Sequence, residues 1–295
     1  MSYAEGMKQA MRIHDKFERE EDAATYWAQG APLIPVEDLA YTGGGGQRQA
    51  ARLYRGDRSG PAPVLLYIHG GGWVGGSIAL NEPAVRSLVA ESGWSVLSVS
   101  YRLAPHDPYP AGLQDCRAAL EWLDLNGPAF GLDSSRIAIG GASAGANLAV
   151  ATSLAEPVRP LVGMILFYGV FGASLDTPSY KTYADGHGLT RARMAALFEQ
   201  YDPENRRFHD PLIAPLLADD LSALSPALLV AAQMDVLADD SRAFAARMQA
   251  RGGRAVLLEV EGVTHGFINR GRLVPAARTA LTRAARFLIS LENKS

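Results

Sequence analysis

IAIGGASAGANLAVAT, at residues 137–152, joins a short β-rich run to a glycine-rich turn and then to a helical pattern of small residues. Its centre, GASAG at 141–145, fits the pattern G-x-S-x-G. In a strand–turn–helix the serine of this pattern sits on a strained turn, which closes only if its neighbours are small. A glycine-rich turn with an incidental serine is the plainer alternative. The flanking strand and helix patterns favour the first interpretation, which makes Ser143 a candidate nucleophile.

Runs like the one before Ser143 recur without alternation of apolar and polar residues, which is typical of strands buried on both faces of a parallel sheet. They occupy 64–68, 94–101, 136–140, 161–168, 226–233 and 254–260. Helical patterns lie between them, at 81–92, 111–126, 145–156, 239–252 and 275–292. This alternation predicts an α/β fold with a doubly wound, mostly parallel sheet. The four glycines at 43–46 predict a hairpin turn near the sheet edge.

Two segments interrupt the alternation of strands and helices. One is the helix-like region at about 1–38, and the other is 174–212, which is polar and rich in tyrosine. An insertion on the side of a parallel sheet where the strands end often covers a site. We therefore expect the second segment to cover a functional site at that edge.

Composition limits the classes of protein to consider. The chain has 295 residues, of which 48% are hydrophobic, and its 28 basic and 31 acidic residues give a net charge of −3. A nucleic-acid-binding protein would carry a basic face, so we expect no nucleic-acid partner. The single cysteine, Cys116, rules out an intrachain disulfide, and its helical surroundings favour a buried thiol. With neither a signal-peptide pattern nor an apolar run of membrane-spanning length, we expect a cytoplasmic protein without membrane insertion.

A serine nucleophile needs a histidine base, which comes after the serine and the acid in this type of fold. His265, in EVEGVTHGFIN, follows the last strand-like run and precedes the final helical pattern. It alone has the position of the base. The other histidines precede the serine or lie in the polar segment: His14, His69, His106, His187 and His209.

The acid that orients the histidine is expected at the carboxyl end of a strand, on the same rim as the serine. Asp235 ends the run PALLVAAQMD and meets this requirement. Asp219 and Asp220 precede the strand. Asp239 and Asp240 are typical of the cap and first turn of the next helix, where the helix dipole favours acids. We therefore assign Asp235 as the acid, with Asp239 as the main competitor.

The glycine-rich stretch HGGGWVGGS, at 69–77, has two interpretations. Gly70, Gly72 and Gly75 fit the dinucleotide fingerprint G-x-G-x-x-G, which also needs an acid about 20 residues later at a strand end. Glu91 is the nearest acid, but it lies inside a helical pattern. The alternative is a loop whose bare N–H groups bind an oxyanion. Because only the second interpretation also uses Ser143, we favour it.

Taken together, these motifs resemble the hormone-sensitive-lipase-like family of α/β-hydrolase carboxylesterases. The carrying stretches span most of the chain, at 69–77, 98–116, 141–149, 209–240 and 262–267. The resemblance implies a single α/β-hydrolase domain over 1–295, with an eight-stranded, mostly parallel sheet flanked by helices. It also implies a helical cap formed by about 1–38 and 174–212, on a catalytic core of about 39–173 and 213–295. Neither a cofactor nor a metal is implied.

By position, Ser143 resembles the family's nucleophile, Asp235 its acid and His265 its base. The backbone donors of the oxyanion hole correspond to Gly71, Gly72 and Ala144. Three aromatic residues flank the motifs and are candidates for lining the acyl or alcohol pocket: Trp73, Phe171 and Phe267.

Three stretches depart from the family pattern. Ala142 and Ala146 replace an aspartate and a glycine of the usual GDSAGG, so one carboxylate beside the nucleophile is missing. His106 replaces the glutamate of YRLAPE, and Val236 replaces the proline of D-P-L. The three residues of the triad are retained.

The sequence therefore predicts a serine carboxylesterase that hydrolyses short- to medium-chain acyl esters of small molecules through an acyl-enzyme. An amidase, formamidase or lactonase with the same triad is the first alternative. A non-catalytic small-molecule receptor on the same fold is the second. The oligomeric state stays open, with a homodimer as one option.

Overall fold

The computed structural model describes residues 3–14, 16–17, 19–155 and 160–292, and these form one eight-stranded sheet in the order β1-β2-β4-β3-β5-β6-β7-β8. From β4 to β8 neighbouring strands are parallel, whereas β2 is antiparallel to both β1 and β4. The strands are β1 (Val36–Thr42), β2 (Arg48–Tyr54), β3 (Ala62–Ile68), β4 (Ser95–Val99), β5 (Leu132–Ala142), β6 (Gly163–Phe167), β7 (Ala227–Met234) and β8 (Ala255–Thr264). The predicted mostly parallel α/β sheet is confirmed.

The central strands are apolar because both of their faces are covered. Every residue of β3, β4 and β6 is buried, which explains why these runs lack alternation. The glycines at 43–46 close the β1–β2 hairpin at the edge of the sheet, as predicted. Strand β5 begins at Leu132, four residues before the predicted run. The prediction missed this part of the strand because residues 133–136 are polar and not fully buried.

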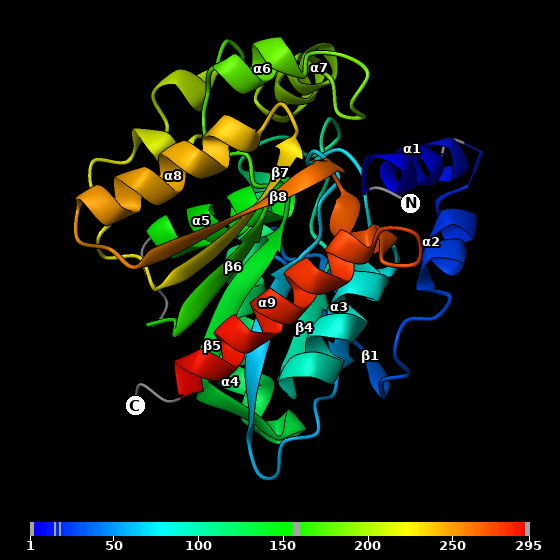
Figure 1. Cartoon of the computed structure of the whole chain (residues 1–295). Coiled ribbons are helices and arrows are strands. Elements are labelled where there is room, and N and C mark those ends of the chain that lie inside the picture. Colours follow the sequence, from blue (N-terminus) through cyan, green and yellow to red (C-terminus); the bar gives the residue numbers. More distant parts are fainter. Residues whose placement is uncertain (1–2, 15, 18, 156–159, 293–295) are drawn as a thin grey trace.

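Helices cover both faces of the sheet (Figure 1). They are α1 (Tyr3–His14), α2 (Glu20–Ala28), α3 (Ile78–Ser92), α4 (Ala111–Asn126), α5 (Ala144–Leu154), α6 (Pro178–Thr182), α7 (Arg191–Tyr201), α8 (Ala238–Ala250) and α9 (Pro275–Glu292). Residues of α3 and α9 belong to one hydrophobic core, and residues of α4, α5 and α8 to the other. The five predicted helices are present, although Glu156, the last residue of one prediction, lies outside the described residues.

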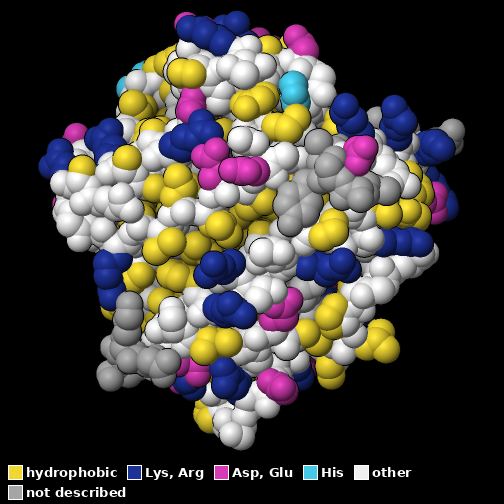
Figure 2. All heavy atoms as spheres, in the orientation of Figure 1, with side chains coloured by type: hydrophobic (Ala, Val, Ile, Leu, Met, Phe, Trp, Pro, Cys, Tyr) yellow, Lys and Arg dark blue, Asp and Glu magenta, His cyan; other side chains and the backbone are white. Residues whose placement is uncertain are grey.

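The segment 174–212 lies at the end of the molecule toward which β7 points, and the N-terminal segment begins beside that end and follows the adjoining flank (Figure 1). The segment 174–212 contains α6 and α7, and the N-terminal segment contains α1 and α2; residues 1, 2, 15 and 18 of the latter lie outside the described part. Among the described residues, no helix combines the length and hydrophobicity that a bilayer span requires. Figure 2 shows basic and acidic side chains interspersed on one face of the molecule, without a continuous basic surface there.

Candidate active site

Ser143 is the single residue between the end of β5 and the start of α5, and its backbone conformation is rare for residues other than glycine. Its φ is 56° and its ψ is −119°, and a positive φ in a residue other than glycine stores backbone strain. Two backbone hydrogen bonds hold it there: Ser143 N–H donates to Phe167 O at 2.8 Å, and Asn147 N–H donates to Ser143 O at 3.1 Å. The turn therefore presents the hydroxyl at the carboxyl edge of the sheet.

Small residues beside the serine are required by the approach of strand β3. A Cβ atom on Gly141 or on Gly145 would overlap the backbone oxygen of Ile68. The turn thus packs backbone to backbone against β3, which leaves no room for a side chain at either position. This contact is the physical basis of the G-x-S-x-G pattern in this chain.

The structure brings the three predicted triad residues together. His265 Nε2 lies 2.9 Å from Ser143 Oγ, and His265 Nδ1 lies 2.6 Å from Asp235 Oδ2. Asp235 is 1% exposed and also accepts a hydrogen bond from Leu237 N–H, whereas Ser143 is 8% exposed. Because a carboxylate only accepts hydrogen bonds, the Nδ1 proton faces Asp235 and Nε2 is free to accept the serine proton.

The glycine loop after β3 has a shape that requires glycine. The φ angles of Gly71 and Gly72 are 134° and 63°. A Cβ on Gly71 would overlap the backbone oxygen of Gly75, and one on Gly72 would lie 2.6 Å from Leu197 of α7. Among the described residues, the backbone hydrogen bonds leave the N–H groups of Gly71 and Gly72 unused. Both glycines line the cavity that contains Ser143.

Ala144, the third expected donor, is the first residue of α5. The first N–H groups of a helix have no acceptor within the helix, and the helix dipole makes them favourable partners for an anion. Ala144 is fully buried directly after the nucleophile. Among the described residues, the backbone hydrogen bonds leave the N–H groups of Gly71, Gly72 and Ala144 without an acceptor, and Gly71 and Gly72 line the same cavity as Ser143.

His69, which opens the glycine loop, is a buried structural residue. Its Nδ1 lies 2.9 Å from Gly70 O, and its ring stacks on Tyr101 at 4.4 Å between centroids. Tyr101 OH in turn donates to His69 O at 3.1 Å. Burial lowers the pKa of His69 to about 4. A neutral imidazole therefore supports the loop from behind.

The three aromatic residues that we expected to line the substrate pocket are buried in the core. None of them is among the residues that line the cavity containing Ser143. Phe171 and Phe267 are fully buried; the first stacks on Phe244 at 4.5 Å, and the second packs against Tyr168 at 5.8 Å. Proximity to a motif in sequence does not determine which way a side chain points. The structure therefore places both rings in the core, and their contact with substrate stays a prediction.

Trp73, the third aromatic, fastens the glycine loop to the helix that follows the nucleophile. Its ring stacks on Tyr201 at 4.4 Å, with 5° between the planes, and its Nε1–H donates to Asn147 Oδ1 at 3.2 Å. Asn147 Nδ2 donates to Val170 O and Ile213 O, at 2.9 and 2.8 Å. Asn147, which sequence reasoning missed, therefore links the glycine loop and α5 to the residues that follow β6 and to the chain just after the 174–212 segment.

A cavity of about 450 Å³ opens over Ser143, within the size range of small-molecule sites. Its walls come from the glycine loop, from residues 264–270 around His265, and from both interrupting segments. The N-terminal segment contributes Met11 and Trp27. The segment 174–212 contributes Gly188, Leu189, Arg193, Met194 and Leu197.

Tyr168 is a cavity residue that sequence reasoning missed. It follows β6 with a φ of 37°, and its ring lies 4.7 Å from the His265 ring. Its position at a strand end, on the same rim as Ser143 and Asp235, was the available signal. In the described part of the chain, no group of three or more histidine, cysteine or acidic side chains is arranged to hold a metal ion.

Comparison with known proteins shows which family the chain resembles. A family model described as alpha/beta hydrolase fold matches residues 65–269. The chain is 39% identical over 227 residues to carboxylesterase NlhH of Mycobacterium tuberculosis, covering 75% of this chain and 71% of that protein. It is 34% identical over 254 residues to ethyl acetate hydrolase of Pseudomonas putida, covering 83% and 80%.

Solved structures give the same result over nearly the whole chain. A thermophilic carboxylesterase cloned from a metagenomic library superposes with a TM-score of 0.88 at 33% identity, covering 99% of this chain and 98% of that one. A hyperthermophilic esterase of Pyrobaculum calidifontis also has a TM-score of 0.88, at 32% identity and with coverages of 98% and 97%. These similarities extend through both interrupting segments.

Proposed function

This chain belongs to the hormone-sensitive-lipase-like family of the alpha/beta hydrolase fold, and from that premise we propose that it hydrolyses carboxylic esters through an acyl-enzyme on Ser143. The observation that carries the proposal is the continuous line of hydrogen-bond contacts from Ser143 through His265 to Asp235, at 2.9 and 2.6 Å. A serine hydroxyl is a weak nucleophile by itself, so a base within hydrogen-bond reach supplies what it lacks.

In the first half of the reaction, His265 Nε2 takes the Ser143 proton as Oγ attacks the acyl carbonyl. The carbonyl π electrons move to oxygen, and the N–H groups of Gly71, Gly72 and Ala144 donate to the resulting oxyanion. Loss of one such donor typically costs about 2.7–4 kcal/mol of transition-state stabilisation. Asp235 holds the imidazole tautomer and stabilises the imidazolium. The oxyanion then collapses, and His265 gives its proton to the leaving alcohol.

In the second half, water replaces the alcohol. His265 removes a proton from the water as its oxygen attacks the acyl-enzyme carbonyl, and the same N–H groups receive the second oxyanion. Collapse breaks the acyl–Oγ bond, and the proton returns from His265 to Ser143. The products are a carboxylic acid, an alcohol and the free enzyme.

For the substrate, we propose small esters with short to medium acyl chains. A cavity of about 450 Å³ suits an acyl and an alcohol group of modest size. We further propose that 1–38 and 174–212 together act as a cap, because Met11 and Trp27 of the first and Leu197 of the second contribute to the cavity wall. The relative named ethyl acetate hydrolase supports a small ester.

The alternatives use the same fold in other ways. Amidase, formamidase or lactonase activity needs the same triad, but the relatives' names favour esters. A receptor would not need a histidine within 2.9 Å of the serine hydroxyl.

The test is a series of p-nitrophenyl esters from acetate to laurate, compared with matched aryl amides. We expect the highest kcat/KM at short to medium chain lengths, little amide turnover, and a fluorophosphonate adduct on Ser143 by intact mass. The control is Ser143→Ala, which should show neither turnover nor adduct. Ester turnover equal to that of Ser143→Ala would overturn the esterase, and a missing adduct would favour the receptor.

A further inference from the structure

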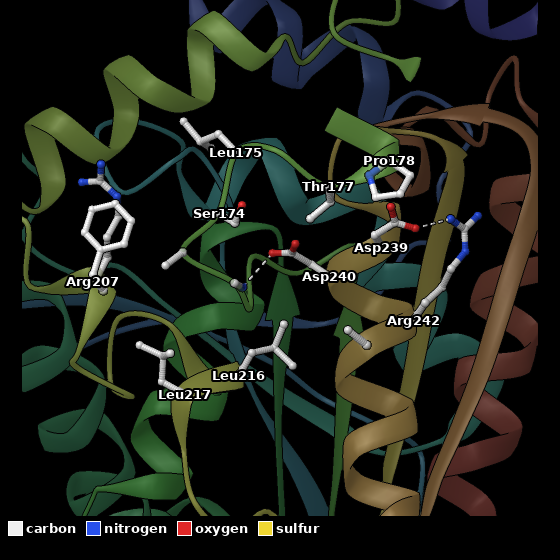
Figure 3. Close-up of a pocket in the computed structure, with 14 residues that line it drawn as sticks. Ser174, Leu175, Thr177, Pro178, Arg207, Leu216, Leu217, Asp239, Asp240 and Arg242 are labelled. Atoms are coloured by element: carbon white, nitrogen blue, oxygen red, sulfur yellow. Dashed lines mark hydrogen bonds and ion pairs between the residues drawn. The ribbon is translucent and has the colours of Figure 1, made fainter. Parts of the chain in front are cut away.

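A second hollow, of about 780 Å³, lies between the two ends of the 174–212 segment and the first turns of α8 (Figure 3). Among the described residues, it shares no lining residue with the cavity over Ser143. Leu175 and Pro178 come from the start of the segment, and Phe208 from its end. A molecule bound here would contact both connections of that segment to the core.

The hollow contains a buried acid with an unused oxygen. Asp240 is 2% exposed, and its Oδ2 accepts hydrogen bonds from Phe171 N–H and Gly172 N–H, both at 2.8 Å. Its Oδ1 has no hydrogen-bond partner in the described part of the chain. Figure 3 shows the carboxyl group facing the space between Ser174, Thr177 and Leu216.

This acid also lacks a cationic partner, unlike its neighbour Asp239. Asp239 Oδ1 lies 2.6 Å from Arg242 Nη1. Among the described residues, no basic side chain pairs with Asp240. Burial, followed by the nearby charges of Asp235 and Asp239, raises its pKa to about 7. A cation at Oδ1 would supply the missing partner at neutral pH.

The rest of the hollow is mainly apolar. Leu175, Leu216 and Leu217 line it with Phe208, which is 57% exposed. Two guanidinium groups line the hollow, those of Arg207 and Arg242, and Figure 3 shows them on opposite sides of Asp240. Arg242 is paired with Asp239 and Glu259. Arg207 Nη1 donates to Asn205 Oδ1 at 2.7 Å and lies 3.9 Å from Asp202 Oδ2, so its charge is already partly compensated.

We propose that this hollow binds an organic ammonium ion with an alkyl or aryl body. Its N–H groups donate to Asp240 Oδ1, and its apolar part covers Phe208 and Leu216. Charge complementarity selects this ligand class, because a neutral alcohol offers one hydrogen bond but no charge, and an acid would be repelled. The site is independent of the catalytic proposal, since none of its residues acts on the ester.

The test uses the full chain carrying Ser143→Ala, titrated with hexylammonium chloride and with hexan-1-ol by calorimetry at pH 8. The two probes have the same alkyl body and differ in charge. We expect saturable binding of one hexylammonium ion, at least tenfold tighter than hexan-1-ol. Equal affinities, or no saturable binding of the amine, would overturn the proposal.

Asp240→Asn tests the assigned partner. The asparagine keeps an oxygen for the Phe171 and Gly172 N–H groups but removes the charge. Hexylammonium affinity should fall at least tenfold, with hexan-1-ol affinity unchanged. Asp220→Asn, at an exposed acid outside the hollow, is the matched control and should change neither. Retained amine binding in folded Asp240→Asn would show that the ligand sits elsewhere.

A measurement without any change at Asp240 protects the test against a folding defect. Hexylammonium should bind more tightly at pH 8 than at pH 6, because Asp240 ionises across this range. Within the described residues, the other titratable or charged groups near Asp240 are Asp235, Asp239, Tyr180, Arg207 and Arg242. Affinity that is the same at pH 6 and pH 8 would contradict the role of this acid.

Discussion

His265 Nε2 lies 2.9 Å from Ser143 Oγ, although 122 positions separate the two residues in the chain. Strand order explains the meeting: β5 precedes the serine, β7 precedes Asp235 and β8 precedes the histidine, and these strands lie parallel in the order β5-β6-β7-β8. Their carboxyl ends therefore share one rim. The catalytic proposal depends on this rim being rigid, which leads to predictions about the residues that build it.

Replacing His265 and His69 one at a time distinguishes the proposed catalytic base from the histidine that supports the glycine loop. His265→Ala should lower kcat by about 10⁴-fold or more and largely abolish fluorophosphonate labelling, because loss of one triad member removes most of the triad's contribution. His69→Ala should retain labelling at Ser143, because in the described part of the chain the side chain of His69 contacts Gly70 and Tyr101 and makes no hydrogen bond to the nucleophile. Turnover and intact mass measure both. Loss of labelling in a folded His69→Ala protein would contradict this assignment.

Gly72→Ala should disturb the oxyanion loop. The new Cβ would lie 2.6 Å from the end of the Leu197 side chain, and its φ of 63° is strained for any residue except glycine. We therefore expect Leu197 and the loop to shift and the N–H donors to lose their alignment. We expect kcat to fall by about 10²-fold, the scale of one lost donor. Gly46→Ala is the matched control, because Gly46 has a φ of 84° with open space around it. It should cost about 1 kcal/mol in stability and leave kcat unchanged; equal kcat values for both variants would refute the prediction.

Asn147→Ala should reduce both stability and activity. The side chain is fully buried and bonds Trp73 Nε1, Val170 O and Ile213 O, so three buried groups lose a partner at about 1–3 kcal/mol each before relaxation. We expect a loss of about 3 kcal/mol by urea unfolding. We also expect a lower kcat in the folded fraction, since Trp73 belongs to the glycine loop.

The control for Asn147 is Asn126→Ala, at an exposed residue whose Nδ2 donates to Trp122 O within the same helix. That variant should change stability by less than about 1 kcal/mol. If the two substitutions cost the same, the buried hydrogen bonds are not what holds the loop.

Much of this fold was predictable because its information is local. The apolar run of β3 predicts a strand that is covered on both faces. The small residues beside Ser143 indicate that another backbone, that of Ile68, approaches closely. Strand ends on one rim then select Asp235 and His265. In each case the backbone geometry limits which residue types fit at a position, so the residue types in turn predict the geometry.

The side-chain directions were not predictable in the same way. Trp73 and Phe171 flank catalytic motifs, yet they pack on Tyr201 and Phe244, which are distant in sequence. Which face an aromatic ring takes depends on the tertiary partner that it meets. The same holds for Asp240: its place in the first turn of α8 was expected, but its bonds to Phe171 and Gly172 depend on the fold.

Asp240 should also give the chain a distinctive dependence of stability on pH. Its pKa is about 7 in the folded state, against an ordinary 3.8, because burial disfavours the charge. Between about pH 4 and pH 7 the folded protein holds a proton that the unfolded chain has released. The free energy of unfolding contributed by this group therefore falls as pH rises through that range and is level above it. The displacement corresponds to about 4 kcal/mol.

Asp240→Asn removes this titration while keeping an acceptor for the two backbone N–H groups. The variant should therefore gain stability relative to the native chain on going from pH 5 to pH 8, by up to about 3 kcal/mol. Urea unfolding of both proteins at each pH measures the difference. His69 acts in the opposite sense, because its lowered pKa makes stability fall below pH 6.5, but it is present in both proteins and cancels in the comparison. A difference that stays constant across this range would mean that Asp240 is ionised throughout and that its charge is compensated within the folded chain.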